Sequence, residues 1–252
     1  MKKIGISLSG GGSRGIVHIG ILKAFDEAGI KISMMSGASA GAIVGLFYCS
    51  GYSPDNIMEI IRETKLIKYV RPAISLQGLL RLESIIEIFN KYIRHDSFEA
   101  LKIPLIVSAT NVNKGTNALF SDGSLIRSVL ASCAVPVIFK PIKIGDDSYI
   151  DGGVLNNLPV EPLIGQCDVI VASNCNPVSE KYEPGSMRSL LERSLLMAIN
   201  VNTLTKRDLC DVFLEPEGLR NFGGFDFSKS AEIFKIGYEY GKSVTGELLK
   251  KL

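Results

Sequence analysis

The sequence lacks features that mark several large classes of protein. Its five cysteines include no Cys-x-x-Cys pair, and a chain of 252 residues needs no disulfide staples, so we expect reduced thiols and a cytoplasmic protein. No apolar run approaches the roughly 20 residues that cross a bilayer. The 28 Lys and Arg nearly balance the 26 Asp and Glu, which argues against a nucleic-acid partner. A peripheral contact with a membrane stays open.

What the sequence does contain predicts one α/β domain over residues 1–252. Its hydrophobic content of 46% is enough for one sizeable core. Glycines interrupt the N-terminal apolar run, which favours a strand over a signal peptide. Several strands are continuously apolar and alternate with helices, which indicates a mostly parallel sheet covered on both faces. The expected strands are residues 4–9, 30–35, 105–109, 117–121, 169–173 and 212–214 with a hairpin at 142–150, and the expected helices are 16–28, 40–49, 83–94, 125–133, 188–209 and 231–249 with one opening at 53–54.

A glycine-rich loop, Gly10-Gly11-Gly12-Ser13-Arg14-Gly15, follows the first strand and opens a helix. This matches the G-x-G-x-x-G pattern of dinucleotide sites. Such a site needs an acidic residue at the end of the second strand, whereas Met34, Met35 and Ser36 stand there. Glycines expose backbone N–H groups, and a helix N-terminus favours negative charge, so the loop is equally suited to hold a developing oxyanion.

The second motif, Gly37-Ala38-Ser39-Ala40-Gly41, is a G-x-S-x-G at a strand-to-helix junction. In a nucleophile elbow the serine lies on a strained turn with its hydroxyl exposed, and flanking glycines avoid collisions across the bend. The alternative is that these small residues only permit close packing of helix on strand. The context favours Ser39 as a nucleophile, and the N–H of the next residue is a further candidate donor to the substrate oxygen.

A nucleophilic serine needs a base, and histidine is scarce: the chain has only His18 and His95. In an α/β-hydrolase the histidine follows the serine and the acid along the chain. His95 lies only 56 residues after Ser39, too few to build the sheet that such a triad spans. His18 lies one turn into the first expected helix, where a packed or capping histidine is the more common occurrence.

Asp151 is the carboxylate that stands out, because it ends an expected strand and precedes Gly152-Gly153. Two glycines let the backbone turn tightly and approach other groups closely. A buried aspartate acts directly as a base when burial raises its pKa towards the working pH. The alternative interpretation of Asp-Gly-Gly is a simple turn.

Together the three motifs resemble the patatin-like phospholipase family, and their order along the chain agrees with it. The resemblance extends over roughly residues 3–175 and includes Thr110-Asn111 and the stretch from Ala131 to Pro136. It implies an α/β/α sandwich, a Ser39–Asp151 dyad without histidine, no metal or cofactor, and hydrolysis of fatty acyl esters of glycerolipids. The implied oxyanion loop comprises Gly10, Gly11, Gly12 and Arg14, and the implied elbow glycines are Gly37 and Gly41.

Three other functions stay open at this point. An acyltransferase would use the same dyad with an alcohol in place of water, a regulator would bind lipid without catalysis, and a nucleotide-binding enzyme would lack its ribose-binding acid. Residues 66–82 mix apolar side chains with Lys68, Arg71 and Arg81, which suits either a lid that meets lipid or an ordinary solvated connection. Cys175, expected in the loop after a strand, is the thiol whose reactivity is worth testing.

Overall fold

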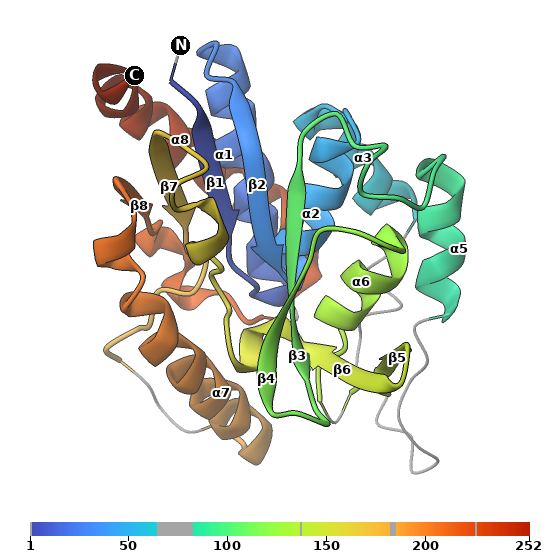
Figure 1. Ribbon diagram of the computed structural model, residues 1–252. Helices are drawn as coiled ribbons and strands as arrows, with labels where there is room; N and C mark the ends of the chain where they lie inside the picture. Colours follow the sequence, from blue (N-terminus) through green and yellow to red (C-terminus); the bar gives the residue numbers. More distant parts are fainter. Residues whose placement is uncertain (1, 65–82, 137, 182–184, 225) are drawn as a thin grey trace.

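The computed structural model describes residues 2–64, 83–136, 138–181, 185–224 and 226–252 (Figure 1). The expected lid at residues 66–82 therefore lies outside the described residues. A single mixed sheet forms the centre of the fold, in the order β5-β6-β3-β2-β1-β7-β8, with β4 paired to β3. Its strands are β1 (Ile4–Leu8), β2 (Ile32–Ala38), β3 (Leu105–Asn111), β4 (Thr116–Phe120), β5 (Ile142–Ile144), β6 (Asp147–Asp151), β7 (Val169–Ser173) and β8 (Val212–Leu214).

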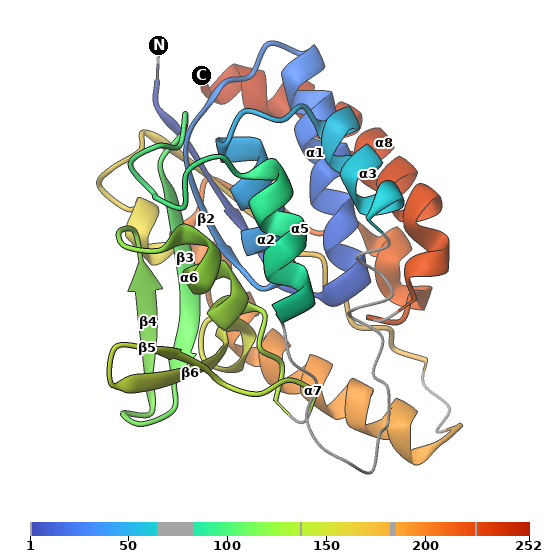
Figure 2. The same ribbon diagram turned by 90° about the vertical axis from the view of Figure 1, so that its right-hand side faces the viewer.

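Helices cover the sheet on both sides, which confirms the expected mostly parallel α/β architecture. One face is covered by a helical layer in which α1 packs along α8 beside α2 (Figure 2). On the other face the short helix η3 and its flanking residues pack on β7 through Leu158, Val160 and Leu163. The helices are α1 (Ile16–Glu27), α2 (Ala40–Cys49), α3 (Pro54–Glu63), α5 (Glu83–Tyr92), α6 (Leu125–Ser132), α7 (Met187–Leu204) and α8 (Ser230–Lys251), with short 3₁₀ helices η1 (Gly12–Gly15), η2 (Gly152–Val154), η3 (Glu161–Leu163), η4 (Arg207–Leu209), η5 (Glu217–Asn221) and η6 (Phe227–Lys229).

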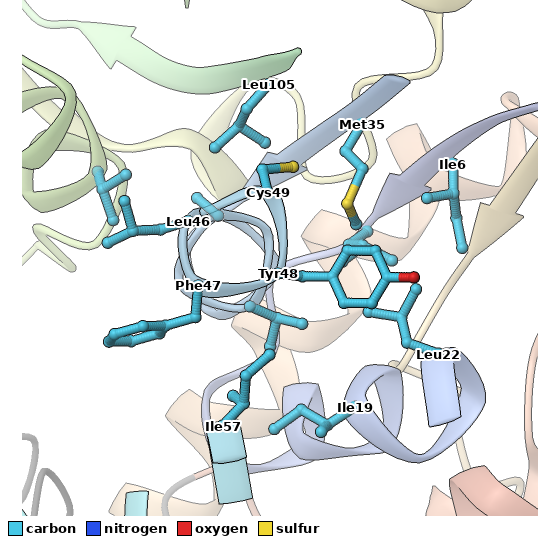
Figure 3. Packing of buried hydrophobic residues seen from close by; sticks show 14 of the residues in the cluster. Ile6, Ile19, Leu22, Met35, Leu46, Phe47, Tyr48, Cys49, Ile57 and Leu105 are labelled. Atoms are coloured by element: carbon cyan, nitrogen blue, oxygen red, sulfur yellow. The ribbon is translucent and has the colours of Figure 1, made fainter. Parts of the chain in front are cut away.

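Helix α2 lies in the middle of the core. It is apolar all round, and Figure 3 shows its side chains pointing in every direction from the helix axis. Leu46, Phe47 and Cys49 are fully buried, and Leu46 lies in one cluster with Met35 of β2 and Leu105 of β3. A helix that is hydrophobic on all sides is stable only when it is enclosed, so the sequence of α2 fixes its place under the sheet.

Two predicted boundaries were wrong by three residues or more. β2 extends to Ala38, beyond the expected end at Met35, because Ser36 and Gly37 pair in parallel with both β1 and β3. That backbone pairing outweighs the low strand propensity of glycine. Helix α7 ends at Leu204, five residues before the expected end, where Asn202, Thr203 and Thr205 are weak helix formers. In the described part of the chain, no helix has the length and apolar content of a membrane span.

Candidate active site

Two strand ends meet on one edge of β3. β2 runs parallel to β3 and ends with Ala38 opposite Ser108. β6 runs antiparallel to β3 and ends with Asp151 opposite Ala109, the next residue. Because β4 pairs with β3 alongside both of these stretches, β2 and β6 share the other edge of β3. The chain therefore brings Ser39, which follows Ala38, next to Asp151, although 112 residues separate them in the sequence.

The backbone at Ser39 is strained. Ser39 has φ 49° and ψ −119°, and it is the only non-glycine residue with positive φ in the described chain. Such a conformation costs of order 1–3 kcal/mol and persists only where the surroundings enforce it. The flanking glycines are required, because a Cβ on Gly41 would lie 2.2 Å from the Leu8 carbonyl oxygen and one on Gly37 would lie 2.8 Å from Gly41. This is the geometry of a nucleophile elbow, and Ser39 remains partly exposed.

Ser132 holds the backbone of Ser39 in this conformation. The Ser39 N–H donates to Ser132 Oγ at 2.8 Å, and Ser132 Oγ donates in turn to the Ser108 carbonyl at 2.6 Å. Ser132 lies at the end of α6 and is fully buried. The two hydrogen bonds tie the elbow to β3, the strand with which the end of β6 at Asp151 is paired.

Asp151 is a buried carboxylate held on several sides. Only 6% of its surface is exposed. Its Oδ1 accepts the Gly153 N–H at 2.7 Å, and Thr110 donates to its backbone carbonyl at 3.0 Å. Burial raises the pKa of Asp151 to about 6, while hydrogen bonds from the Ser39 side chain and the Gly153 N–H act in the opposite direction. A carboxylate with this pKa can accept a proton near neutral pH.

The first glycine of the loop is held by two asparagines. The Gly10 N–H donates to the Asn157 carbonyl at 3.1 Å, and the Gly10 carbonyl accepts from Asn157 Nδ2 at 3.3 Å and Asn176 Nδ2 at 2.6 Å. A Cβ on Gly10 would lie 3.0 Å from the Ser39 Cβ, so the loop passes directly beside the elbow. Since the Gly10 N–H and carbonyl are both engaged, Gly10 anchors the loop beside the elbow.

The next two glycines are free to donate. Within the described residues, no hydrogen bond engages the N–H of Gly11 or Gly12. Gly12 has φ +59°, and a Cβ there would lie 2.0 Å from the Gly224 carbonyl oxygen, so this position requires glycine. Arg14 is buried, and its Nε donates to the Phe222 carbonyl at 2.7 Å. Arg14 thereby attaches the loop to the C-terminal part of the chain.

Neither histidine is placed as a base for Ser39. His18 is fully buried, with Nε2 within 3.0 Å of the Ser9 carbonyl and Nδ1 within 2.9 Å of Ser173 Oγ. A carbonyl only accepts, so Nε2 carries the proton and Nδ1 accepts from Ser173. Burial lowers the pKa of His18 to about 4, which keeps the ring neutral. His95 is exposed just after α5.

Cys175 is buried beside the glycine loop. Its Sγ lies 3.2 Å from Ser9 Oγ and 3.3 Å from the Gly10 carbonyl oxygen. Burial raises the pKa of Cys175 to about 11, so the thiol stays protonated and unreactive at neutral pH. Among the described residues, no group of three or more His, Cys, Asp or Glu is placed to hold a metal ion.

Sequence reasoning missed Ser132, Asn157 and Asn176. All three are almost completely buried, although each lies in or beside a loop where polar residues are ordinarily exposed. Ser132 belongs to the stretch that supports the family resemblance. Asn176 has a weaker signal, since it follows an apolar strand whose carboxyl end shares an edge with the glycine loop and Ser39. Nothing local distinguishes Asn157 from an ordinary turn residue.

Sequence comparisons relate the chain to known proteins. Residues 6–164 match the family model described as patatin-like phospholipase. An uncharacterized NTE family protein of Mycobacterium tuberculosis is 30% identical over 177 residues, which cover 69% of this chain and 49% of that protein. Neuropathy target esterase sws of Drosophila melanogaster is 35% identical over 289 residues, which cover 99% of this chain and 20% of that protein.

A solved structure shows the same fold. The crystal structure of VipD from Legionella pneumophila superposes with a TM-score of 0.65 at 16% identity, and the match covers 98% of this chain and 67% of VipD. The chain spans about half the length, or less, of the curated relatives described above.

Proposed function

Because the chain belongs to the patatin-like phospholipase family, we propose that it is a serine hydrolase that cleaves acyl esters of lipids, with Ser39 as nucleophile and Asp151 as base. One observation carries the proposal: β2 and β6 end opposite consecutive residues of β3, next to glycine N–H groups that no described residue engages. The name of the Drosophila relative, an esterase, supports the same bond type.

In the first half of the reaction, Asp151 accepts the proton of the Ser39 hydroxyl while Oγ attacks the ester carbonyl carbon. The carbonyl oxygen gains negative charge, and the N–H groups of Gly11 and Gly12 donate to it. The bond to the alcohol then breaks, Asp151 returns the proton to the leaving oxygen, and an acyl group stays on Ser39. In the second half, Asp151 takes a proton from water, the water oxygen attacks the acyl carbon, and the fatty acid leaves as Ser39 recovers its proton.

Three features favour this chemistry near neutral pH. The raised pKa of Asp151 brings its basicity closer to that of a general base such as histidine. The strained turn at Ser39 is held by the hydrogen bond to Ser132 and by the close packing at Gly37 and Gly41, which orients the hydroxyl for attack. The loop is anchored at Gly10 and at Arg14, which fixes the two donors between them.

Labelling with a fluorophosphonate probe tests the nucleophile. We expect the wild-type chain to take up the probe on the peptide that contains Ser39, and Ser39→Ala to lose both labelling and hydrolysis of p-nitrophenyl butyrate by about 10⁴-fold or more. Asp151→Asn should lose about 10²- to 10⁴-fold. Ser50→Ala is the matched control, because Ser50 lies at the other end of α2 and its Oγ bonds only the Leu46 carbonyl.

Two results would defeat the proposal. Hydrolysis by Ser39→Ala at the wild-type rate would exclude Ser39 as nucleophile. A folded wild-type chain that takes up no probe and cleaves no ester would favour a lipid-binding regulator. Product analysis with added lysolipid separates hydrolysis from acyl transfer, since only a transferase would form a new diacyl lipid.

A further inference from the structure

Helix α7 turns its apolar side away from the protein. Its outward apolar residues fall within about one half of the helix circumference: Leu195 follows Leu191 by four residues, and Val201 follows Met197 by four. They are exposed by between 45% and 68%, whereas apolar side chains on a helix ordinarily face the core. The members of this outward face are Leu190, Leu191, Leu195, Met197, Val201 and Leu204.

The opposite side of α7 is largely polar and faces the candidate site. Thr203 is buried, and Glu192, Arg193 and Asn200 are half-buried. Burial is the main cause that lowers the pKa of Arg14, and the charges of Arg193 and Glu192 also act on it. The polar side therefore lies near the glycine loop, and the orientation of α7 is the reverse of that expected for a helix that seals a core.

The outward face of α7 lies at the same end of the sheet as the candidate site. Figures 1 and 2 place α7 at the end of the sheet to which β1 and β2 point, away from both chain termini. Val154 and Leu155 follow the Asp151–Gly153 turn and are also exposed, by 44% and 39%. Apolar surface thus occurs both on α7 and directly after the proposed base.

The described chain does not cover this face, because no other described helix or strand packs along α7 (Figure 2). A second copy is a poor occupant. With 18 residues, α7 is roughly 27 Å long and about 10 Å wide, so its outward face outlines roughly 300 Å². Each partner in a stable dimer contributes ~800 Å².

A lipid layer suits the face better. The outward positions whose side chains are described carry no charge, as suits contact with hydrocarbon. A helix with one apolar face lies in the plane of a lipid–water interface. We propose that the outward face of α7 docks on the surface of a lipid bilayer and holds the Ser39 site there.

The proposal rests on the proposed function for its substrate, but docking is measured without catalysis. Flotation with phosphatidylcholine vesicles is carried out in the Ser39→Ala background. Replacing both Leu191 and Leu195 by Ser should lower the vesicle-bound fraction by at least 10-fold. Leu119→Ser with Leu249→Ser is the matched control, because these leucines are similarly exposed on β4 and α8 and should leave flotation unchanged.

The active enzyme supplies the second measurement. Leu191→Ser with Leu195→Ser should hydrolyse soluble p-nitrophenyl butyrate within two-fold of wild type and should lose its activity on vesicle lipid by about 10-fold or more. Light scattering identifies the competing occupant, since a wild-type dimer that this variant converts to a monomer would overturn lipid docking.

Failure of each idea leaves a different result. The docking proposal is overturned if the Ser39→Ala protein floats equally with and without the two α7 substitutions, or if it does not float at all. Either result would stand even when the wild-type chain cleaves soluble ester normally. Loss of all ester hydrolysis in wild type, together with flotation that depends on α7, overturns the proposed function and supports docking.

Discussion

Helices α2 and α7 both contain many apolar residues, yet only α2 is enclosed on all sides. α2 follows directly from β2 at the strained Ser39, so the short turn forces it against the sheet, where α1, α3 and α6 complete its surroundings. α7 is joined to β7 by a longer segment and has polar residues on its inner side. The apolar content of a helix determines whether it needs an apolar surface to pack against. The connection to the preceding strand and the polarity of each helix face determine whether that surface is the core of the same protein.

The largest expected effect concerns the free energy of unfolding. Leu46→Ala removes a fully buried side chain from α2 and should lower stability by about 2–5 kcal/mol, because a cavity forms in a packed core. Chemical denaturation of the two proteins measures this difference.

Leu195→Ala on α7 is the matched substitution. Leu195 is 51% exposed, so the change should lie within about 0.5 kcal/mol. A loss as large as that of Leu46→Ala would mean that α7 is packed in solution, and the contrast between the two helices would fail.

The pH dependence of ester hydrolysis tests Asp151 as the base. Since Asp151 must be ionised to act as a base, and its pKa is about 6, kcat/KM for a soluble ester should rise with pH and level off above about 7. At pH 4 it should be about 100-fold below the plateau. The measurement is initial rates on p-nitrophenyl butyrate between pH 4 and 8.

The same pH profile, measured on the α7 variant, tests whether the candidate site is independent of the outward face of α7. Leu191→Ser with Leu195→Ser should reproduce the wild-type profile, because burial of Asp151 does not depend on the outward face of α7. A shifted midpoint in that variant, or a wild-type rate that falls as pH rises through 6, would contradict the assignment of the base.

A smaller effect is expected at Ser132, the residue that fixes the start of α2. Ser132→Ala removes the acceptor for the Ser39 N–H and should lower kcat by about 10-fold with little change in KM, because the nucleophile is misplaced and substrate contacts remain. Ser132→Cys should restore part of the loss. The measurement is steady-state kinetics on the soluble ester.

Ser128→Ala provides the control for this prediction. Ser128 lies one turn earlier on α6, is similarly buried, and donates only to the Ser124 carbonyl. Its kcat should stay within two-fold of wild type. Equal losses in both variants would reduce Ser132 to a structural residue of α6.

By itself the sequence determined the local chemistry. The glycine loop, the elbow around Ser39 and the turn after Asp151 each depend on consecutive residues whose backbone requirements are visible in the residue types. Alternating apolar segments likewise predicted the sheet and most helices. The burial of α2 also follows from its sequence, because the helix has no polar side.

Only the tertiary structure decided which distant groups meet. The pairing of β2 and β6 with one edge of β3 brings Ser39 to Asp151 and extends β2 to Ala38. A separate long-range contact engages the Gly10 N–H with the Asn157 carbonyl. The same folding turns the apolar side of α7 outward. Strand register and helix orientation arise from contacts between residues far apart in the chain, and no short stretch of sequence encodes both partners of such a contact.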